Sequence, residues 1–279
     1  MKRDLHARSL HAVRGYIFDI DGTLALGDSS LNGYQALPGA IETLDLLETR
    51  NIPYVAFTNG STKTPQQLSQ ALVKAGLRID AERTLTPVSI ALHLFRRKKY
   101  RRLLVLGGEG VWRPLVEAGF DVVRSPDRAD DAQAVLIGWH PTFALADVDA
   151  ACRAVWAGAD LYTVSTAPYV ASRDGRTLGI SGALSAAVRS VTGKRATIVG
   201  KPSQEALKVA CARLGAAPQE VAIVGDDPSL ENAMALRGGA LSVGVHTGLS
   251  SAADFAGLPH GQRPHYSLSG VQQLLEMIR

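Results

Sequence analysis

The sequence predicts an α/β protein in which a Rossmann-like, doubly wound parallel sheet is interrupted by a second, inserted α/β unit. Three observations lead to this fold class. Short apolar runs typical of buried strands alternate along the chain with stretches of helical periodicity. Reactive polar side chains stand where several of the apolar runs end. These reactive ends lie near the two ends of the chain, and the middle has no comparable cluster of carboxylates.

The expected strands are short and apolar, and the expected helices between them are amphipathic. The strands are 16–20 (YIFDI), 54–59 (YVAFTN), 102–107 (RLLVLG), 132–138 (AQAVLIG), 161–166 (LYTVST), 196–200 (ATIVG), 221–226 (VAIVGD) and 240–245 (ALSVGV). Helical periodicity marks 38–51, 64–77, 203–216 and 271–279. Pro38 and Pro65 stand at or near the first positions of two helices, where proline is tolerated, and Gly76 stands where the second should stop.

The composition is that of a globular protein. Hydrophobic residues make up 46% of the 279 residues and charged residues 20%, which argues against disorder. No apolar run reaches the roughly 18 residues of a membrane helix, and residues 1–14 lack the apolar segment of a secretory signal. We therefore expect a cytoplasmic protein without membrane contact. Cys152 and Cys211 have no metal-ligand spacing and are expected to be buried free thiols.

The charge distribution suits an anionic ligand. The formal net charge is +4, and much of the excess lies in the run FRRKKYRR at 95–102. Because no aromatic residues are interleaved well enough to stack bases, we expect this run to be a solvated helix end rather than a nucleic-acid contact. The expected partner is a small phosphorylated metabolite, not a nucleic acid.

The reactive strand ends define the expected domains. They carry Asp19 with Asp21, Thr58, Lys201 and Asp226. In an open parallel sheet, ligands bind beyond the carboxyl ends of the strands, so these side chains should converge. We expect a catalytic core made of 1–85 and 190–279, with 86–189 forming an inserted α/β cap that covers the site.

Asp19 and Asp21 end a buried strand only two positions apart. Two like charges 4 Å apart cost roughly 4 kcal/mol at an effective dielectric constant of about 20, so cations must compensate for them. One candidate is Lys201. Another is a divalent metal ion held by Asp19, a main-chain carbonyl and Asp226. A set of oxygen ligands with few carboxylates favours Mg²⁺ over zinc.

Thr58 ends the strand 54–59 and precedes Asn59 and Gly60. A hydroxyl group, together with main-chain N–H groups in the turn that follows, is suited to bind phosphoryl oxygens. A threonine at a strand end is by itself more often structural. Its position in series with the aspartates and Lys201 favours the functional interpretation.

Four motifs in this order carry a family resemblance. They are Asp-x-Asp-Gly-Thr at 19–23, Thr-Asn at 58–59, Gly-Lys-Pro at 200–202 and Gly-Asp-Asp at 225–227. The chain resembles the haloacid dehalogenase (HAD) superfamily, and more narrowly subfamily IIA, the NagD-like group of p-nitrophenyl phosphatases and phosphoglycolate phosphatases. The resemblance extends over nearly the whole chain. It implies a cap inserted between the second and third motifs, and a possible homodimer formed through that cap.

The resemblance implies a role for each aspartate of the first motif. Asp19 would attack phosphorus and form an aspartyl-phosphate. Asp21 would protonate the leaving oxygen and then activate the water that hydrolyses the intermediate. Asp21 would have to be protonated for the first step, which agrees with a carboxyl pKa raised by neighbouring anions.

The other motifs are implied to bind the phosphoryl group and the metal ion. Thr58, Asn59 and Gly60 would hold the transferring group, and Lys201 would neutralise it and orient the nucleophile. Mg²⁺ would be bound by Asp19, the main-chain oxygen of Asp21, and Asp226.

The sequence departs from the family pattern at several positions. A second aspartate usually follows Asp226 by five residues; here that position is Glu231, and Asp227 is the other candidate for the supporting acidic role. In the cap, His140 stands where relatives often have an aspartate. Candidate cap contacts with substrate are Trp139, His140, Thr166 and Tyr169, for each of which a structural role is an equal alternative.

These observations predict a Mg²⁺-dependent phosphatase that hydrolyses a small phosphomonoester through an aspartyl-phosphate. Phosphoglycolate, a sugar phosphate, a nucleoside monophosphate and pyridoxal phosphate all remain open as substrates. Two alternatives remain as well. One is a phosphotransferase or mutase that passes the phosphoryl group to an alcohol. The other is a catalytically silent protein that binds a phosphorylated metabolite.

Overall fold

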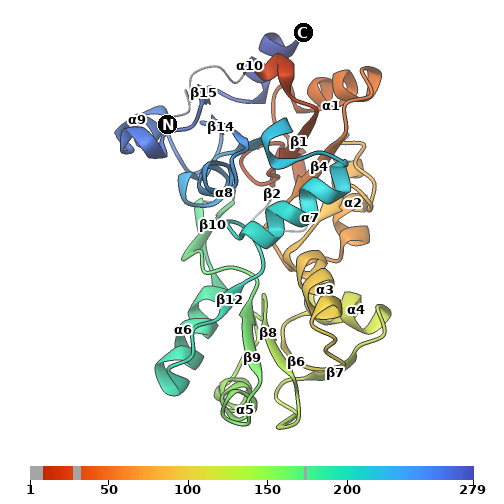
Figure 1. Ribbon diagram of the computed structural model, residues 1–279, viewed down its shortest axis with the longest axis vertical. Coiled ribbons are helices and arrows are strands. Elements are labelled where there is room, and N and C mark those ends of the chain that lie inside the picture. Colours follow the sequence, from red (N-terminus) through yellow and green to blue (C-terminus); the bar gives the residue numbers. More distant parts are fainter. Residues whose placement is uncertain (1–8, 28–32, 173–174) are drawn as a thin grey trace.

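The computed structural model describes residues 9–27, 33–172 and 175–279, without the side chains of residues 170–177. Two parallel sheets, each flanked by helices, lie one beyond the other along the long axis of the molecule (Figure 1). The predicted α/β fold class is confirmed.

Within the described residues, the first sheet has six strands, all parallel. Their order is β15 (Tyr266–Leu268), β14 (Leu241–Val245), β13 (Val221–Gly225), β1 (Gly15–Phe18), β4 (Tyr54–Phe57) and β5 (Thr84–Leu85). The first strand in the chain is thus central. The sheet grows from it through β4 and β5 on one side and through β13, β14 and β15 on the other, which makes it doubly wound.

The second sheet is also parallel, and its described strands number five. Their order is β12 (Thr197–Ile198), β9 (Asp160–Thr163), β8 (Ala134–Ile137), β6 (Arg102–Leu106) and β7 (Asp121–Arg124). The predicted boundary at residue 190 assigns β12 to the core, but β12 pairs with β9. We therefore propose that the inserted unit extends through Ile198. The division into 1–85, 86–189 and 190–279 otherwise stays a prediction.

Two antiparallel hairpins project from the sheets. They are β2 (Ala25–Gly27) with β3 (Tyr34–Ala36), and β10 (Tyr169–Ser172) with β11 (Gly175–Leu178). We call the part of the molecule built on the first sheet the first unit, and the part built on the second sheet the second unit. Hairpin β2–β3 follows β1 of the first unit, and hairpin β10–β11 follows β9 of the second unit. Strand β10 lies against β2. The two hairpins therefore bring the units into contact above the strand ends.

The four predicted helices are present, and further helices connect the remaining strands. The helices are α1 (Ala40–Thr49), α2 (Pro65–Lys74), α3 (Pro87–Arg97), α4 (Glu109–Glu117), α5 (Leu145–Trp156), α6 (Ile180–Thr192), α7 (Gln204–Leu214), α8 (Ala233–Gly238), α9 (Ala252–Gly257) and α10 (Val271–Ile278). Single turns occur at η1 (Leu10–Ala12), η2 (Pro218–Glu220), η3 (Pro228–Asn232) and η4 (His260–Gln262). Thr64 and Pro65 start α2 as predicted, whereas α1 begins two residues after Pro38.

Both faces of the first sheet are buried. Along β1, Tyr16 and Phe18 pack into an apolar cluster with α1, α2 and α10, and Ile17 packs into another with α3 and α7. This alternation is what a strand covered by helices on both sides requires.

The cluster that contains Ile17 continues into the second unit. It runs through Ile90 and Phe95 of α3 to Leu103 and Val105 of β6. The two sheets therefore share a continuous apolar core, with α3 between them.

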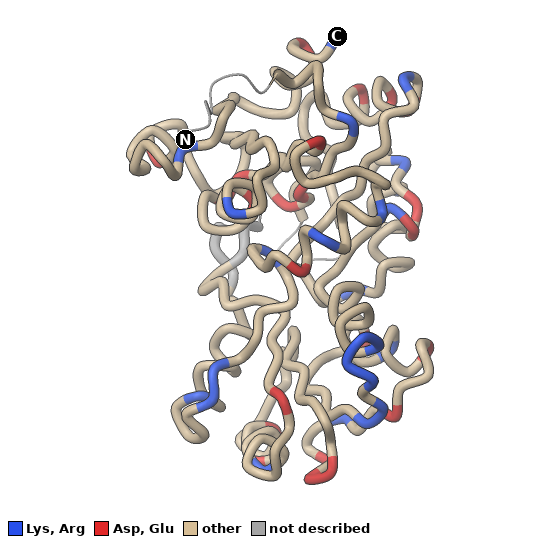
Figure 2. The backbone as a smooth tube through the Cα atoms, viewed as in Figure 1, with Lys and Arg blue, Asp and Glu red and all other residues tan. Residues whose placement is uncertain are grey.

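Several global expectations can be compared with the structure. The basic run 95–102 forms the end of α3, the turn after it and the first residue of β6, and it is seen as a blue stretch of the backbone in Figure 2. The side chains of Arg96, Arg97, Lys98 and Lys99 are exposed to solvent. Cys152 and Cys211 are both buried and free. No described helix combines the length and the apolar character needed to cross a membrane.

The first turn of α5 generates a prediction about stability. The buried Asp147 carboxylate accepts a hydrogen bond from the Ala144 N–H at 2.6 Å and lies 3.3 Å from the ring of His140. Burial alone would raise the pKa of Asp147, but hydrogen bonds to its carboxylate outweigh that effect and lower the pKa below the ordinary value of 3.8. We expect Asp147→Ala to lower the free energy of unfolding by about 1–3 kcal/mol.

The matched control is Asp149→Ala on the same helix. Asp149 makes an exposed ion pair with Arg153, so its removal should change stability by less than about 1 kcal/mol. Because the folded-state pKa of Asp147 is lowered, its contribution is present at neutral pH and is lost as pH falls below 3.8 towards the folded value. Thermal melts of both variants from neutral to acid pH test this, and equal melting temperatures for the two variants at neutral pH would contradict it.

Candidate active site

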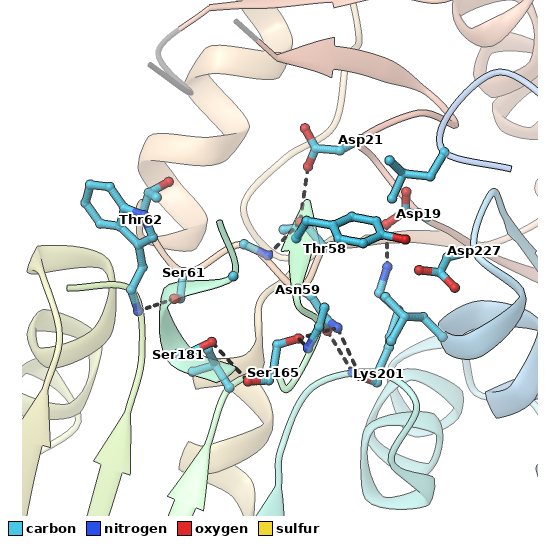
Figure 3. Close-up of a pocket in the computed structure, with 18 of the residues that line it drawn as sticks. Asp19, Asp21, Thr58, Asn59, Ser61, Thr62, Ser165, Ser181, Lys201 and Asp227 are labelled. Atoms are coloured by element: carbon cyan, nitrogen blue, oxygen red, sulfur yellow. Dashed lines mark hydrogen bonds and ion pairs between the residues drawn. The ribbon is translucent and has the colours of Figure 1, made fainter. Parts of the chain in front are cut away.

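The structure brings together side chains from the ends of three adjacent strands. Asp19 and Asp21 follow β1, Thr58 follows β4, and Asp226 follows β13. Because β4, β1 and β13 are neighbours and parallel, their carboxyl ends meet at one edge of the sheet. Lys201 enters from the loop between β12 and α7. Figure 3 shows Asp19, Asp21, Thr58 and Lys201 around one pocket, which Asp226 also lines.

The pocket has a volume of about 110 Å³ and two chemically different sides. The side formed by the first sheet carries carboxylates, a hydroxyl and a lysine. The second unit contributes the apolar residues Trp139, Val164, Ala167, Leu178 and Ile180, together with the hydroxyl groups of Ser165 and Ser181. A polar group can therefore be held at one end while an apolar group contacts the other.

Lys201 is the centre of the polar side. Its ammonium group is almost completely buried and hydrogen-bonds the Asp19 carboxylate, the Glu231 carboxylate at 2.6 Å and the main-chain oxygen of Phe57 at 2.7 Å. Burial favours the neutral amine, but Asp19 and Glu231 outweigh this and raise the pKa of Lys201 above its usual range. The lysine is therefore charged.

Asp19 is held rigidly at the end of the central strand. Its N–H donates to the main-chain oxygen of Val224 at 2.9 Å, which extends the pairing of β1 and β13 by one residue. Burial raises the pKa of the Asp19 carboxyl, Lys201 opposes that rise, and Asp21 adds to it. The carboxylate is thus both buried and fixed against a cation.

Asp21 lies in the turn that follows. Gly22 has φ +90°, and a Cβ atom there would lie 2.8 Å from Oδ2 of Asp226, so only glycine lets this turn approach Asp226 so closely. Oδ2 of Asp21 accepts a hydrogen bond from the Thr58 hydroxyl at 3.3 Å. Burial raises the pKa of Asp21 to about 6, although Lys201 and the Thr58 hydroxyl oppose the rise.

Asp226 adds a further buried carboxylate. Its Oδ2 accepts a hydrogen bond from the Leu249 N–H at 2.6 Å. Burial, together with the neighbouring carboxyl groups of Asp19 and Glu231, raises the pKa of Asp226 to about 8. Among the described residues that line the pocket, Lys201 is the only lysine or arginine. The polar side therefore holds more buried carboxyl groups than one ammonium group can balance when they are ionised, which is why their pKa values are raised.

The donor set indicates which cation would fit among these carboxyl groups. In the described part of the chain, no three His, Cys, Asp or Glu side chains gather closely enough to hold a metal ion by themselves. Any metal bound at Asp19 and Asp226 would need main-chain or solvent oxygens as its other ligands. Such an all-oxygen set fits a hard divalent cation.

The structure separates the two candidates for the supporting acidic residue. Glu231, in η3, is buried, and its carboxylate reaches Lys201 at 2.6 Å. The longer side chain of Glu231 fits because residue 225 is glycine. A Cβ atom at position 225 would lie 2.1 Å from Cγ of Glu231 and would collide with it. Asp227 instead accepts hydrogen bonds at 2.7 Å from the N–H and hydroxyl groups of Ser229 and lies at the pocket edge.

The turn after β4 shows two different arrangements. The N–H of Gly60 donates to the Thr58 hydroxyl at 2.8 Å, and both residues line the pocket. Asn59 also lines it, but its amide is hydrogen-bonded to the main chain of Lys201 at 2.8 and 2.9 Å. A direct contact between Asn59 and substrate stays a prediction.

The four candidate cap contacts divide into two pairs. Trp139 and Tyr169 line the pocket. His140 and Thr166 do not appear in its lining, and the His140 ring faces Asp147 instead. The side chain at position 140 therefore supports the start of α5 rather than the pocket wall.

Sequence reasoning missed several lining residues. Ser165 follows β9. It would have been found by the rule that ligands bind beyond the carboxyl ends of parallel strands (the strand-end rule), had this rule been applied to the second sheet as well. Ser61 receives a hydrogen bond from the Trp139 N–H at 3.0 Å and so joins the two units. Tyr34 and Ile180 come from a hairpin strand and a helix start, where no periodic signal marks them.

Comparison with known proteins places the chain in a family. A family model described as haloacid dehalogenase-like hydrolase matches residues 16–121, and a HAD-hydrolase-like model matches residues 198–274. Chronophin of Mus musculus is 30% identical over 282 residues, which cover 96% of this chain and 94% of the relative. The chain belongs to the haloacid dehalogenase-like hydrolases. The resemblance stated from the sequence is confirmed.

Solved structures of this family have the same fold. A p-nitrophenyl phosphatase from Archaeoglobus fulgidus matches with a TM-score of 0.83 and 25% identity, covering 95% of this chain and 98% of that chain. A glycerol phosphate phosphatase from Mycobacterium tuberculosis, solved in complex with calcium, matches with a TM-score of 0.81 and 26% identity, covering 94% of this chain and 74% of that chain. Both HAD relatives are named phosphatases.

Proposed function

We propose that this chain is a Mg²⁺-dependent phosphomonoesterase that hydrolyses a small phosphorylated metabolite through an aspartyl-phosphate intermediate. The observation that carries the proposal is the buried ion pair between Lys201 and Asp19, with Asp21 two residues away beside Thr58. A fixed carboxylate, a neighbouring carboxyl group and a fixed cation are the groups that a two-step phosphoryl transfer requires. The names of the HAD relatives support the same activity.

In the first step, a carboxylate oxygen of Asp19 attacks phosphorus while the bond from phosphorus to the leaving oxygen breaks. The proton on Asp21 passes to that oxygen, so the alcohol leaves neutral. In the second step, Asp21 takes a proton from water as the water oxygen attacks phosphorus and the bond to Asp19 breaks. A carboxyl group whose pKa is about 6 is suited to both transfers near neutral pH.

Other groups of this chain hold the transferring phosphoryl group. Lys201 keeps Asp19 oriented and opposes the negative charge of the transferring group as Asp19 attacks, so its effect falls on the chemical step. The Thr58 hydroxyl and the Gly60 N–H line the same edge of the pocket; they bond Asp21 and Thr58, respectively, and would turn to the phosphoryl oxygens when substrate binds. Together they position phosphorus against the nucleophile.

Asp19, the main-chain oxygen of Asp21, and Asp226 are the residues that would hold Mg²⁺. The buried carboxyl groups that Lys201 alone cannot balance, and their oxygen donors, support this assignment. When bound, the ion supplies positive charge that balances the carboxylates and the phosphate.

The pocket indicates the kind of alcohol that leaves. Residues of the second unit line the pocket together with the carboxylates, so the group beyond the phosphate lies against that unit. Trp139, Leu178 and Ile180 offer this group an apolar surface. We propose that the second unit acts as a cap and selects an alcohol with an apolar or ring face.

The nucleophile is tested by Asp19→Asn. Loss of the carboxylate removes the attacking oxygen with little change in volume, so phosphate release should fall at least about a thousandfold. The assay measures inorganic phosphate from a panel of phosphomonoesters with Mg²⁺ and, after acid quenching, phosphate bound covalently to the protein. Asp149→Asn, on the exposed face of α5, is the control and should match the wild type. Activity of Asp19→Asn within tenfold of the wild type would refute the mechanism.

The metal assignment is tested by chelation. EDTA should stop turnover, and Mg²⁺ should restore it better than Ca²⁺, because Ca²⁺ takes more ligands at longer distances. Phosphate release is measured before and after each addition. Turnover that persists in excess EDTA would show that the site works without a divalent cation.

The apolar wall is tested by Trp139→Ala. Loss of the indole should lower kcat/KM for phenyl phosphate about 5- to 30-fold, which corresponds to roughly 1–2 kcal/mol of lost apolar contact. The value for acetyl phosphate, which has no ring to contact the indole, should change less than about threefold. Trp156→Ala is the matched control, because that indole is 61% exposed on α5. Equal losses on both substrates would place Trp139 outside the specificity pocket.

A further inference from the structure

Lys201 reaches the site from an unusual direction. The aspartates and Thr58 follow strands of the first sheet directly, whereas Lys201 stands in the loop that leaves β12 of the second sheet. This loop is where the chain returns from the second unit to the first. The main chain of Lys201 therefore has to be fixed by something other than the pairing of core strands.

Asn59 makes the connection. Its Oδ1 accepts a hydrogen bond from the Lys201 N–H at 2.8 Å, and its Nδ2 donates to the Lys201 main-chain oxygen at 2.9 Å. Both polar groups of one amide thus hold one residue that is 142 positions away in the sequence. The dashed lines between the two residues in Figure 3 mark this pair of bonds.

Gly200 makes this close approach possible. A Cβ atom at position 200 would lie 2.4 Å from Oδ1 of Asn59 and 2.4 Å from the main-chain oxygen of Val164. No other residue type fits there without moving the loop. The glycine before the lysine therefore serves the contact with Asn59.

Residues at the end of β4 hold Lys201 both by its main chain and by its ammonium group. Asn59 binds the main chain, and the main-chain oxygen of Phe57 accepts a hydrogen bond from the ammonium group at 2.7 Å. With these two points fixed, the long side chain is stretched along a single path to Asp19.

The remaining capacity of the amide is also used. Nδ2 of Asn59 lies 3.5 Å from the hydroxyl oxygen of Ser165, which follows β9 in the second unit. With Lys201 and Ser165 as acceptors, both hydrogens of Nδ2 have partners. Oδ1 cannot bond a phosphoryl oxygen, because both atoms are hydrogen-bond acceptors. A bond from Asn59 to phosphate would have to replace one of these contacts.

We propose that Asn59 is a positioning residue that acts through Lys201, and not a ligand of the phosphoryl group. The inference rests on the proposed phosphatase function. It assigns Asn59 the task of keeping the lysine main chain in register with the first sheet while the contact with Ser165 ties the same point to the second unit.

The test compares Asn59→Ala in two backgrounds. In the wild-type background, kcat should fall at least about tenfold, while KM and the inhibition constant of inorganic phosphate stay within about threefold. In a Lys201→Arg background, the same substitution should lower kcat less than about threefold, because residues that act through one another are not additive. Asn59→Asp keeps the acceptor for the Lys201 N–H and should retain more activity than Asn59→Ala.

A second measurement covers the case in which Lys201→Arg is inactive or unfolded. Rapid-quench measurement of phosphoenzyme formation by Asn59→Ala at saturating substrate should show a slowed first step with unchanged phosphate inhibition. Ser69→Ala is the control. It removes a buried hydrogen bond of 2.6 Å to the Ile79 oxygen in the same unit, so it should lower the melting temperature and leave kcat and KM unchanged.

The outcomes separate the possibilities. A rise of KM and of the phosphate inhibition constant by tenfold or more, with the same loss in both backgrounds, would make Asn59 a phosphoryl ligand and overturn the inference while the phosphatase function stands. Asn59→Ala with wild-type kcat would overturn it as well. A wild-type protein that releases no phosphate from any compound would overturn the proposed function and this inference with it.

Discussion

The buried ammonium group of Lys201 is the interaction on which the rest of the site depends. It bonds two carboxylates and a main-chain oxygen that arrive from β1, η3 and β4. Removing one member of a buried ion pair typically costs 3–5 kcal/mol, because the other charge is left without compensation. Asp19, Glu231 and Lys201 are therefore stable only as a set, and the strand order of the first sheet serves to assemble that set.

The strand-end rule explains how much of the site was accessible from the sequence. Asp19, Asp21, Thr58 and Asp226 could be placed together because each follows an apolar run, and parallel strands present such ends at one edge. The acidic partner of Lys201 was not resolved, because the choice between Glu231 and its neighbour depends on the fold of η3 and on the space above Gly225.

Other features were hidden because they depend on contacts between distant segments. Asn59 reads as a phosphate ligand from its motif, and only the approach of Lys201 shows that its amide is already bonded. His140 was a candidate pocket residue because it stands where relatives often have an aspartate, but its ring faces Asp147 of the next helix. Strand β12 was assigned to the core because it leads to Lys201, one of the reactive strand ends that defined the core, whereas its pairing is with β9.

The central position of β1 has a consequence for how the chain matures on the ribosome. One edge of β1 can pair with β4 soon after synthesis, but the other edge waits for β13, whose Val224 pairs with Phe18. At roughly 5–20 residues per second, synthesis of the stretch from Phe18 to Val224 takes about 10 to 40 s. Most strands of the second sheet are made and can pair within this interval, while the strand that carries the nucleophile still has an open edge. The catalytic half of the molecule is thus begun first and completed last, and the nascent chain is most exposed to misassociation until residue 225 has emerged.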